Sequence, residues 1–216
     1  MKIIFASHEI LFIQDSSSIL RYIEVAGRTC YKSEDKITQE SSKGFVKGII
    51  KSGHHSVIEH ISITVRFICD RGISHELVRH RLAAFSQEST RYANYSKDKF
   101  GNEITVIKPV FWSEESEAYG FWLTAMKNAE DAYLNLLKTG AKAEEARSVL
   151  PNSLKTEVVM TCNLRQWRHV LNLRCSKAAH PQIREIMFPL LKELHEKIPV
   201  VFDDLYETFI KRSQDL

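Results

Sequence analysis

The densest group of side chains that could do chemistry lies in residues 79–92, RHRLAAFSQESTRY. This window holds three arginines, a histidine, a glutamine, a glutamate and two serines. An arginine guanidinium presents a planar fork of donors that matches phosphate oxygens or a flat carbonyl edge. Because the apolar residues 82–85 interrupt the charges, we favour a partly buried anion site. The alternative is a basic helix end followed by a capped turn.

Arg79, His80 and Arg81 are consecutive. A short helix from Ile73 would deliver them about 100° apart, so that they reach three different groups where two anionic ligands meet. The polar residues 86–91 then resemble a turn whose hydroxyls and amides could cradle a phosphate. A nucleic-acid-binding loop is the competing interpretation, which the net charge of only +3 and the lack of interleaved aromatics disfavour.

The segment 53–60, GHHSVIEH, precedes a predicted strand and invites a metal interpretation. Zinc could use two histidines and a carboxylate, but the spacing of His55, Glu59 and His60 matches neither HExxH nor HxxEH. We therefore favour a site for a polar, non-metal ligand. A polar turn whose histidines bond to the backbone stays equally open.

Asn163 and Arg165 lie where a strand is predicted to end and a helix to begin, a junction whose free amides suit an anion. Further along this helix, Arg174 falls on the apolar stripe of Trp167 and Leu171. A buried guanidinium there needs a partner. The alternative is a cation that meets the last carbonyls of the helix.

For two further side chains the local sequence favours a structural role over a functional one. Arg147 stands alone in a short predicted helix, which favours a surface charge. Cys175 follows Arg174, but it lacks an assignable base that would make it a nucleophile.

Hydrophobic periodicity predicts the elements that must position these residues. We expect helices over 16–30, 39–51, 73–81, 113–140, 164–175 and from 180 to the end with a break near Pro199, and a short one around Arg147 that stops at Pro151. Strands are expected over 61–69 and 156–162. The pattern therefore predicts a helix-rich α/β or α+β fold with few strands.

Composition indicates one ordinary globular domain over 1–216, since no linker or repeat interrupts it. Apolar residues make up 44% and charged residues 26% of the chain. The first residues lack a cleavable signal peptide, and no apolar run reaches membrane-spanning length. The four cysteines are scattered without a CxxC pair, which fits a reducing cytoplasm and argues against a zinc site or disulfides.

Taken together, these motifs resemble the flavin-dependent thymidylate synthases. That family's signature is Arg-His-Arg, about seven residues, Ser and a nearby Arg, matched here by Arg79-His80-Arg81, Ser89 and Arg91. GHHSVIEH, EEARSVLP, NLR and LNLR also occur in the order of the family, so the resemblance spans roughly residues 26–184.

The resemblance implies reductive methylation of dUMP to dTMP, with 5,10-methylenetetrahydrofolate as carbon donor. FAD reduced by NADPH would supply the hydride, without a cysteine nucleophile. It also implies a small central, largely antiparallel sheet surrounded by helices, and a homotetramer with sites shared between subunits. A nucleotide-binding flavoprotein that lacks methylation activity is the alternative, followed by an RNA-binding module.

Site residues are carried over by position. Those assigned to FAD are His54, Ser56, Arg79, His80, Arg81, Gln87, Asn163, Arg165 and His169. Those assigned to dUMP are Glu76, Arg79, Gln87, Glu88, Ser89, Thr90, Arg91, Arg147 and Arg174. Arg174 would be catalytic, stabilising negative charge on N3 and its neighbouring carbonyl so that C5 becomes more nucleophilic. Glu76 and Cys30 depart from the family pattern, since some relatives have glutamine and serine there.

Overall fold

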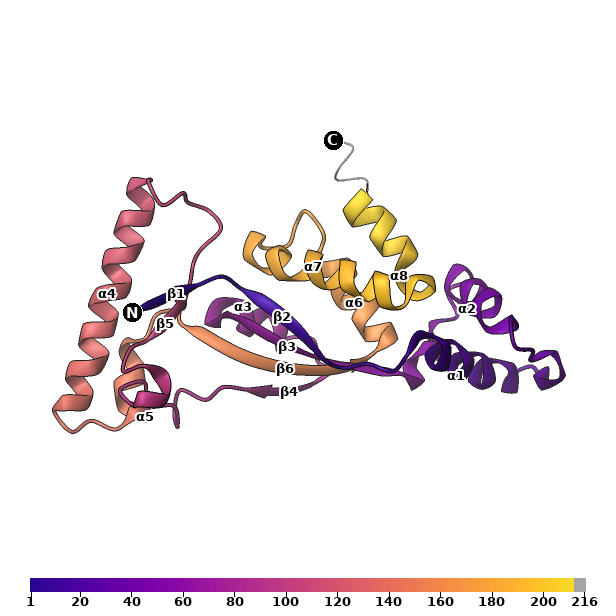
Figure 1. Ribbon diagram of the computed structural model, residues 1–216, viewed down its shortest axis with the longest axis horizontal. Helices are drawn as coiled ribbons and strands as arrows, with labels where there is room; N and C mark the ends of the chain where they lie inside the picture. Colours follow the sequence, from indigo (N-terminus) through magenta and orange to yellow (C-terminus); the bar gives the residue numbers. More distant parts are fainter. Residues whose placement is uncertain (212–216) are drawn as a thin grey trace. The chain divides into compact units, whose positions relative to one another are not determined.

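The computed structural model describes residues 1–211 and shows an α+β fold (Figure 1). A four-stranded antiparallel sheet has the order β2-β3-β6-β4, and a separate parallel pair joins β1 to β5. The strands are β1 Lys2–Ile4, β2 Ser7–Phe12, β3 Ser62–Asp70, β4 Ala84–Gln87, β5 Thr105–Ile107 and β6 Lys155–Asn163. The predicted fold class and its antiparallel sheet are confirmed.

Eight α-helices lie in the described chain: α1 Ser16–Thr29, α2 Ser41–Lys51, α3 Arg71–Leu77, α4 Glu117–Lys138, α5 Ala143–Ala146, α6 Leu164–Arg174, α7 Pro181–Lys197 and α8 Pro199–Tyr206. Shorter 3-10 helices are η1 Glu34–Lys36, η2 His55–His60, η3 Asp98–Phe100 and η4 Arg147–Val149, and a π-helical turn, η5, covers Glu207–Lys211. Over residues 1–211, none of these helices has the length and apolar character needed to span a bilayer.

The two long strands β3 and β6 form because apolar residues alternate with polar ones, so that one face of each strand is buried. The backbone amide of Leu164 donates to the Ile61 carbonyl at one end of the pair. At the other end, the Arg71 amide donates to the Leu154 carbonyl. These bonds fix an antiparallel register and confirm both predicted strands.

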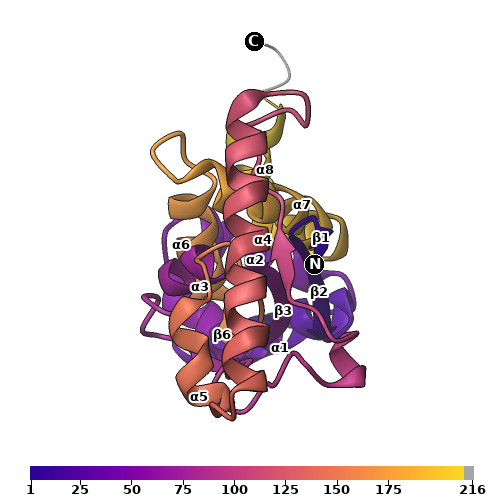
Figure 2. The same cartoon turned by 90° about the vertical axis from the view of Figure 1, so that its left-hand side faces the viewer.

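The chain forms two compact units, and unit 1 comprises Met1–Ser7, Phe67–Arg79 and Phe85–Val159. Its core gathers around α4, which packs against α5 (Figure 2). Tyr133 of α4 is fully buried, and its hydroxyl accepts from the Tyr95 amide at 3.3 Å and donates to the Ala93 carbonyl at 3.5 Å. The helix ends at Lys138, and Gly140 supplies the positive φ of +95° that turns the chain away.

Unit 2 comprises residues 8–66, 80–84 and the described residues from 160 onward. Helix α6 contacts η2, α7 and α8 within it. Trp167 of α6 is fully buried, and its indole Nε1 donates to the Ile63 carbonyl at 3.0 Å. Arg168, next in the chain, donates to both carboxylate oxygens of Asp204 in α8, at 2.7 and 2.6 Å, and also to the Val201 carbonyl. This helix is therefore anchored to both a strand and a helix.

The bounds of α3 and α4 differ from the prediction in ways that have a physical reason. Helix α3 starts early, because the Asp70 side chain caps it by accepting from the Ile73 amide at 2.7 Å, and it ends at Leu77. Arg79, His80 and Arg81 therefore lie in the connection to β4, and the prediction that they share a helix was wrong. Helix α4 begins at Glu117 rather than at 113, because Ser116 is the residue that caps it.

The predictions for three other helices and for the break near Pro199 agree with the structure to within two residues. Those for 16–30, 39–51 and 164–175 correspond to α1, α2 and α6, and the break near Pro199 separates α7 from α8. The last five residues, 212–216, on which the final helix prediction also fell, lie outside the described residues. Of the polar window 86–91, Ser86 and Gln87 belong to β4, so that the turn begins only after them.

Candidate functional site

A pocket of about 650 Å³ opens in unit 2 where η2, the segment before β4 and the start of α6 meet. Its lining residues are mostly polar: Glu59, Leu82, Asn163, Arg165, Gln166 and His169. The Asn163 side chain caps α6 by accepting from the Gln166 amide at 2.9 Å, which explains why the helix starts where the strand ends. The predicted junction therefore exists and lines a pocket.

An exposed ion pair lies in the wall of this pocket. Arg165 Nη1 and Glu59 Oε1 are 2.5 Å apart, although both side chains reach solvent. The pair links NLR to GHHSVIEH, two motifs that are 106 residues apart. Since surface ion pairs contribute little to stability, we expect this pair to contribute little to holding the two motifs together.

Arg174, the last residue of α6, contacts the histidine of the Arg-His-Arg motif. Its Nε donates to His80 Nε2 at 3.0 Å. Arg174 is half-buried and His80 is only 6% exposed. Burial, and then the charges of Arg174 and His169, lower the pKa of His80 to about 4. The imidazole is therefore neutral near pH 7 and can accept this hydrogen bond.

Two interpretations of Arg174 were open: a guanidinium with a partner in the fold, or a cation at the end of the helix. Arg174 has such a partner in His80, and it is also the last residue of α6. The His80 and His169 rings meet edge to face with centroids 6.3 Å apart. Because His169 lines the pocket, this contact connects the partly buried Arg174–His80 pair to the pocket wall.

The positions assigned to FAD fall mostly in unit 2. His54, Ser56 and Arg81 are exposed there, in addition to the residues already described. His54 immediately precedes η2. Arg79 and Gln87, the two other positions, belong to unit 1.

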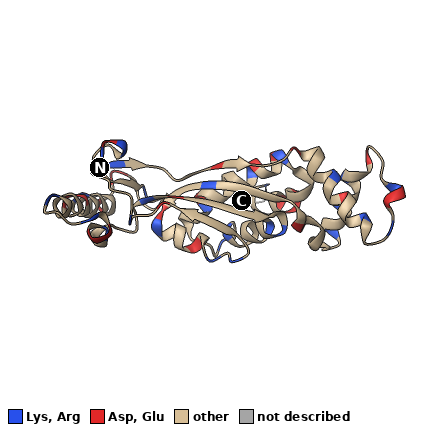
Figure 3. Cartoon of the chain, turned by 90° about the horizontal axis from the view of Figure 1, so that it is seen from below, with Lys and Arg blue, Asp and Glu red and all other residues tan. Residues whose placement is uncertain are grey.

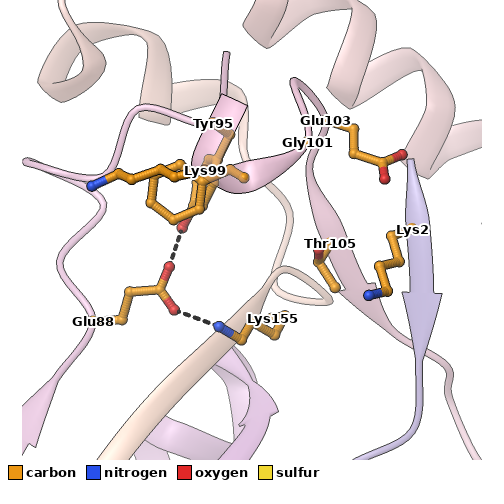
Figure 4. A pocket seen from close by; sticks show the side chains of 9 residues that line it. Lys2, Glu88, Tyr95, Lys99, Gly101, Glu103, Thr105 and Lys155 are labelled. Carbon is orange, nitrogen blue, oxygen red and sulfur yellow. Dashed lines mark hydrogen bonds and ion pairs between the residues drawn. The ribbon is translucent and has the colours of Figure 1, made fainter. Parts of the chain in front are cut away.

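The positions assigned to dUMP fall mostly in unit 1, where Glu88 is held by two neighbours. The Tyr95 hydroxyl donates to its Oε1 at 3.0 Å, and Lys155 Nζ donates to its Oε2 at 3.0 Å (Figure 4). Burial, together with the negative charge of Glu88, raises the pKa of Tyr95. These residues line a pocket of about 330 Å³ with Lys2 and Thr105. Both carboxylate oxygens of Glu88 thus already have donors.

Gln87 is bound to two buried hydroxyls. Its Nε2 donates to Ser74 Oγ at 2.9 Å and to Thr156 Oγ1 at 3.2 Å. Ser74 is fully buried and Thr156 is 1% exposed. The side chain therefore connects β4 to α3 and β6, and its amide orientation is fixed by the fold.

The Arg-containing turn after β4 meets the EEARSVLP motif. Arg91 Nε pairs with Glu144 Oε2 at 2.9 Å, and Arg147 is exposed three residues further on. Ser89 Oγ accepts from the Arg91 amide at 3.3 Å, while Thr90 is buried. Two of the recognised motifs thus meet at this turn. Arg79 is exposed and Glu76 half-buried in the same unit.

The cysteines differ in their access to solvent. Cys175 is 2% exposed, and burial raises the pKa of its thiol to about 12. Cys69 and Cys162 are also buried, whereas Cys30 is exposed. Because the thiolate is the nucleophilic form, Cys175 is poorly suited to attack a substrate in this environment.

Charge is spread over the described elements without separation by sign, as the interspersed blue and red segments of Figure 3 show. Within residues 1–211, no group of three His, Cys, Asp or Glu side chains is arranged to hold a metal ion.

Three pocket residues were absent from the sequence-based site: Glu59, Leu82 and Gln166. Glu59 carries a recognisable signal, because it is the carboxylate of the GHHSVIEH motif. Gln166 lies in the first turn of α6, where a side chain beside free amides was predictable. Leu82 carries no such signal, since its role depends on the exposed position that the chain takes before β4.

Comparison with known proteins places the chain in a family. Residues 12–200 match the family described as "Thymidylate synthase complementing protein". The flavin-dependent thymidylate synthase of Geobacter sulfurreducens is 34% identical over 189 residues, covering 84% of this chain and 80% of the relative. The enzyme of the same name from Corynebacterium aurimucosum is also 34% identical, covering 90% of this chain and 83% of the relative.

A solved structure has a similar fold. It is the crystal structure of a UMP/dUMP methylase, PolB, from Streptomyces cacaoi bound with 5-Br dUMP. The TM-score is 0.77, with 22% identity, over 97% of this chain and 98% of the other. The family match and the identity to these relatives over most of both chains show that this chain belongs to the flavin-dependent thymidylate synthases and is an enzyme of that family.

Proposed function

We propose that this enzyme converts dUMP to dTMP by reductive methylation. The carbon comes from 5,10-methylenetetrahydrofolate, the hydride from FAD that NADPH has reduced, and no cysteine forms a bond to the nucleotide. The observation that carries this proposal is the contact between Arg174 and the buried, neutral His80 of the Arg-His-Arg signature. This contact holds the Arg174 guanidinium in a defined position, where it could act on the nucleotide.

The pocket in unit 2 suits a flavin. It combines the Arg165 guanidinium, the capped start of α6 and the His169 ring, and a diphosphate needs such donors. We propose that these residues hold FAD together with Asn163 and His80. The further positions are His54, Ser56, Arg79, Arg81 and Gln87. When bound and reduced, FAD supplies the hydride.

The turn after β4 suits the nucleotide. Ser89, Thr90 and Arg91 offer hydroxyl and guanidinium donors, and Glu144 brings the Arg147 segment beside them. A monophosphate is recognised by such a combination of cations and hydroxyls. We propose that these residues bind dUMP, with Arg174 and with the remaining positions Glu76, Arg79, Gln87 and Glu88.

Arg174 is the proposed catalytic residue. Once the N3 proton of uracil has passed to solvent, the guanidinium donates to N3 and the neighbouring carbonyl oxygen and stabilises the negative charge that they share, which makes C5 more nucleophilic toward the folate-borne carbon. The stabilisation is catalytic to the extent that Arg174 binds this electron-rich ring, and the transition state reached from it, more tightly than neutral bound dUMP. The raised pKa of the Cys175 thiol supports a route without a cysteine adduct.

We also propose that the enzyme is a cytoplasmic homotetramer whose sites are shared between subunits, with small molecules rather than nucleic acid or membrane as its ligands. Large apolar side chains exposed on the single chain support an assembly. Phe121 on α4 is 70% exposed, Tyr22 on α1 57% and Phe12 on β2 56%.

Two measurements test the proposal. The purified enzyme should be yellow, and it should release tritium from C5-labelled dUMP when given methylenetetrahydrofolate and NADPH. A yellow protein that releases no tritium under these conditions is the flavoprotein without methylation activity. A colourless protein with strongly salt-dependent RNA binding is the nucleic-acid alternative.

Arg174→Ala tests the catalytic assignment. The variant should keep its FAD absorbance and lose turnover by a factor of about 10²–10³, as expected when a donor to a developing negative charge is removed. Arg21→Ala, on the exposed side of α1, is a matched control that should retain turnover. Near-normal turnover of Arg174→Ala would remove Arg174 from the chemistry.

A further inference from the structure

We infer that His80 is a positioning residue for Arg174: its Nε2 accepts the Arg174 Nε–H and thereby fixes the plane of the guanidinium that acts on the pyrimidine. This inference rests on the proposed function. It gives the histidine of the signature motif a partner within the protein, 94 residues further along the chain.

The contact specifies the protonation state of His80. A neutral imidazole has one N–H donor and one acceptor nitrogen. Because Nε2 accepts from Arg174, the proton of the neutral ring belongs on Nδ1. Arg174 and His169, which both come from α6, add to burial in lowering the pKa of His80 to about 4, so the ring is neutral at pH 7.

Arg174 needs such a partner because of its position. It is the last residue of α6, and its long side chain has several rotatable bonds. The five N–H donors of a guanidinium lie in one plane, so one hydrogen bond at Nε to a buried ring fixes the plane of the others. Orientation of this kind matters because a misplacement of about 1 Å can cost a factor of about 10² in rate.

The resemblance assigns His80 to the flavin, and the contact refines that assignment. With Nε2 used by Arg174, His80 can meet the cofactor only through Nδ1–H or its ring face. His169, which lines the pocket and meets His80 edge to face, is the histidine closer to that role. We therefore expect loss of the His80 acceptor to change turnover much more than FAD content.

The first experiment reads the contact without any catalytic assay. Titration of ¹⁵N-histidine-labelled protein by NMR, with His80 assigned by substitution, gives its tautomer and pKa. The wild type should show the Nδ1–H tautomer, and Arg174→Ala should raise the pKa of His80 because a neighbouring positive charge is removed. Arg21→Ala should leave it unchanged. An unchanged pKa in Arg174→Ala, or an Nε2–H tautomer in the wild type, would overturn the inference.

The second experiment separates positioning from flavin binding. In His80→Gln the side-chain oxygen can replace Nε2 as acceptor, whereas His80→Leu offers none. We expect His80→Leu to retain FAD and lose kcat by about 10²-fold, and His80→Gln to recover most of that loss. His75→Leu, on the exposed surface of α3, is the matched control and should keep wild-type kcat.

A double variant gives the sharpest outcome. If His80 acts through Arg174, then His80→Leu should cost nothing further in an Arg174→Ala background. A further loss of kcat, or loss of FAD in His80→Leu alone, would overturn the inference. A wild-type enzyme that releases no tritium would instead defeat the proposed function, while the NMR result would still decide whether His80 holds Arg174.

Discussion

The anchor of α6 offers a quantitative prediction about stability. Arg168 has a side chain that is 9% exposed, and both of its terminal nitrogens reach Asp204, whose side chain is 53% exposed. Asp204→Ala removes both bonds and leaves a nearly buried positive charge with the Val201 carbonyl as its remaining acceptor in the described contacts. The variant should therefore destabilise unit 2.

The magnitude follows from the burial of the two partners. Breaking a fully buried ion pair costs about 3–5 kcal/mol because one charge is stranded. Asp204 is half exposed, so solvent screens the pair, and we expect Asp204→Ala to cost about 2 kcal/mol. Arg168→Met should cost less, since the carboxylate it leaves behind can be hydrated and methionine fills part of the volume.

Urea unfolding followed by circular dichroism measures these differences. Asp203→Ala is the matched control. Asp203 is a similarly exposed neighbour that pairs with His195 Nδ1 at 3.2 Å, and its loss should shift stability by less than about 0.5 kcal/mol. Equal losses for the two aspartates would refute this reasoning, and so would a larger loss for Arg168→Met than for Asp204→Ala.

The same pair should respond to pH. Burial alone would raise the pKa of Asp204, but the hydrogen bonds and charge of Arg168 outweigh it and lower the pKa below the ordinary 3.8. A carboxyl with a lowered folded pKa contributes stability above its unfolded pKa and loses it as the pH falls through the folded value. The difference between wild type and Asp204→Ala should therefore be constant near pH 7 and shrink below about pH 4.

Three shorter predictions concern other parts of the chain. Gly140→Ala should destabilise the protein by about 1–2 kcal/mol, because φ is +95° at this position. Gly120→Ala should stabilise it by about 0.8–1 kcal/mol, because alanine favours the helix and the added Cβ meets nothing within 4 Å. Urea midpoints that move in the same direction for both variants would contradict this. Tyr133→Phe leaves the Tyr95 amide without its acceptor and should lower stability by about 1–3 kcal/mol in thermal unfolding, so an unchanged midpoint would disprove the role of that bond. Native maleimide labelling followed by mass spectrometry should modify Cys30 and spare Cys175, whose thiol pKa is about 12; rapid labelling of Cys175 would reject its burial.

Elements with a long repeated pattern were predictable from the sequence. The apolar periodicity of α1, α4 and α6 and the alternation in β3 and β6 come from burial of one face, which leaves a mark on consecutive residues. Strands β1, β4 and β5 have three or four residues, too few to show a period. In β2 most side chains stay exposed, so its sequence does not alternate in the expected way.

In the candidate site, too, local features were predictable from the sequence and contacts between distant segments were not. The capped junction at Asn163 is a local feature and was predictable, because the strand ends and the helix begins within two residues. The contact of Arg174 with His80 joins two distant segments, and no spacing rule reveals it. The helical placement of Arg79 to Arg81 was wrong because α3 ends at Leu77 with Val78 as its C-cap, a boundary that periodicity alone does not mark.

Helix α6 both lines the pocket and anchors unit 2, and this limits which insertions and deletions the protein can accept. Arg165 and His169, four residues apart, line the pocket, while Trp167 and Arg168 between them hold the helix to β3 and α8. A single residue inserted between Arg165 and His169 would rotate one by about 100° and advance it about 1.5 Å relative to the other. We therefore expect changes in length to be tolerated only outside the helix, for example in residues 176–179, and a graft of this site onto another scaffold to need the anchoring side chains as well.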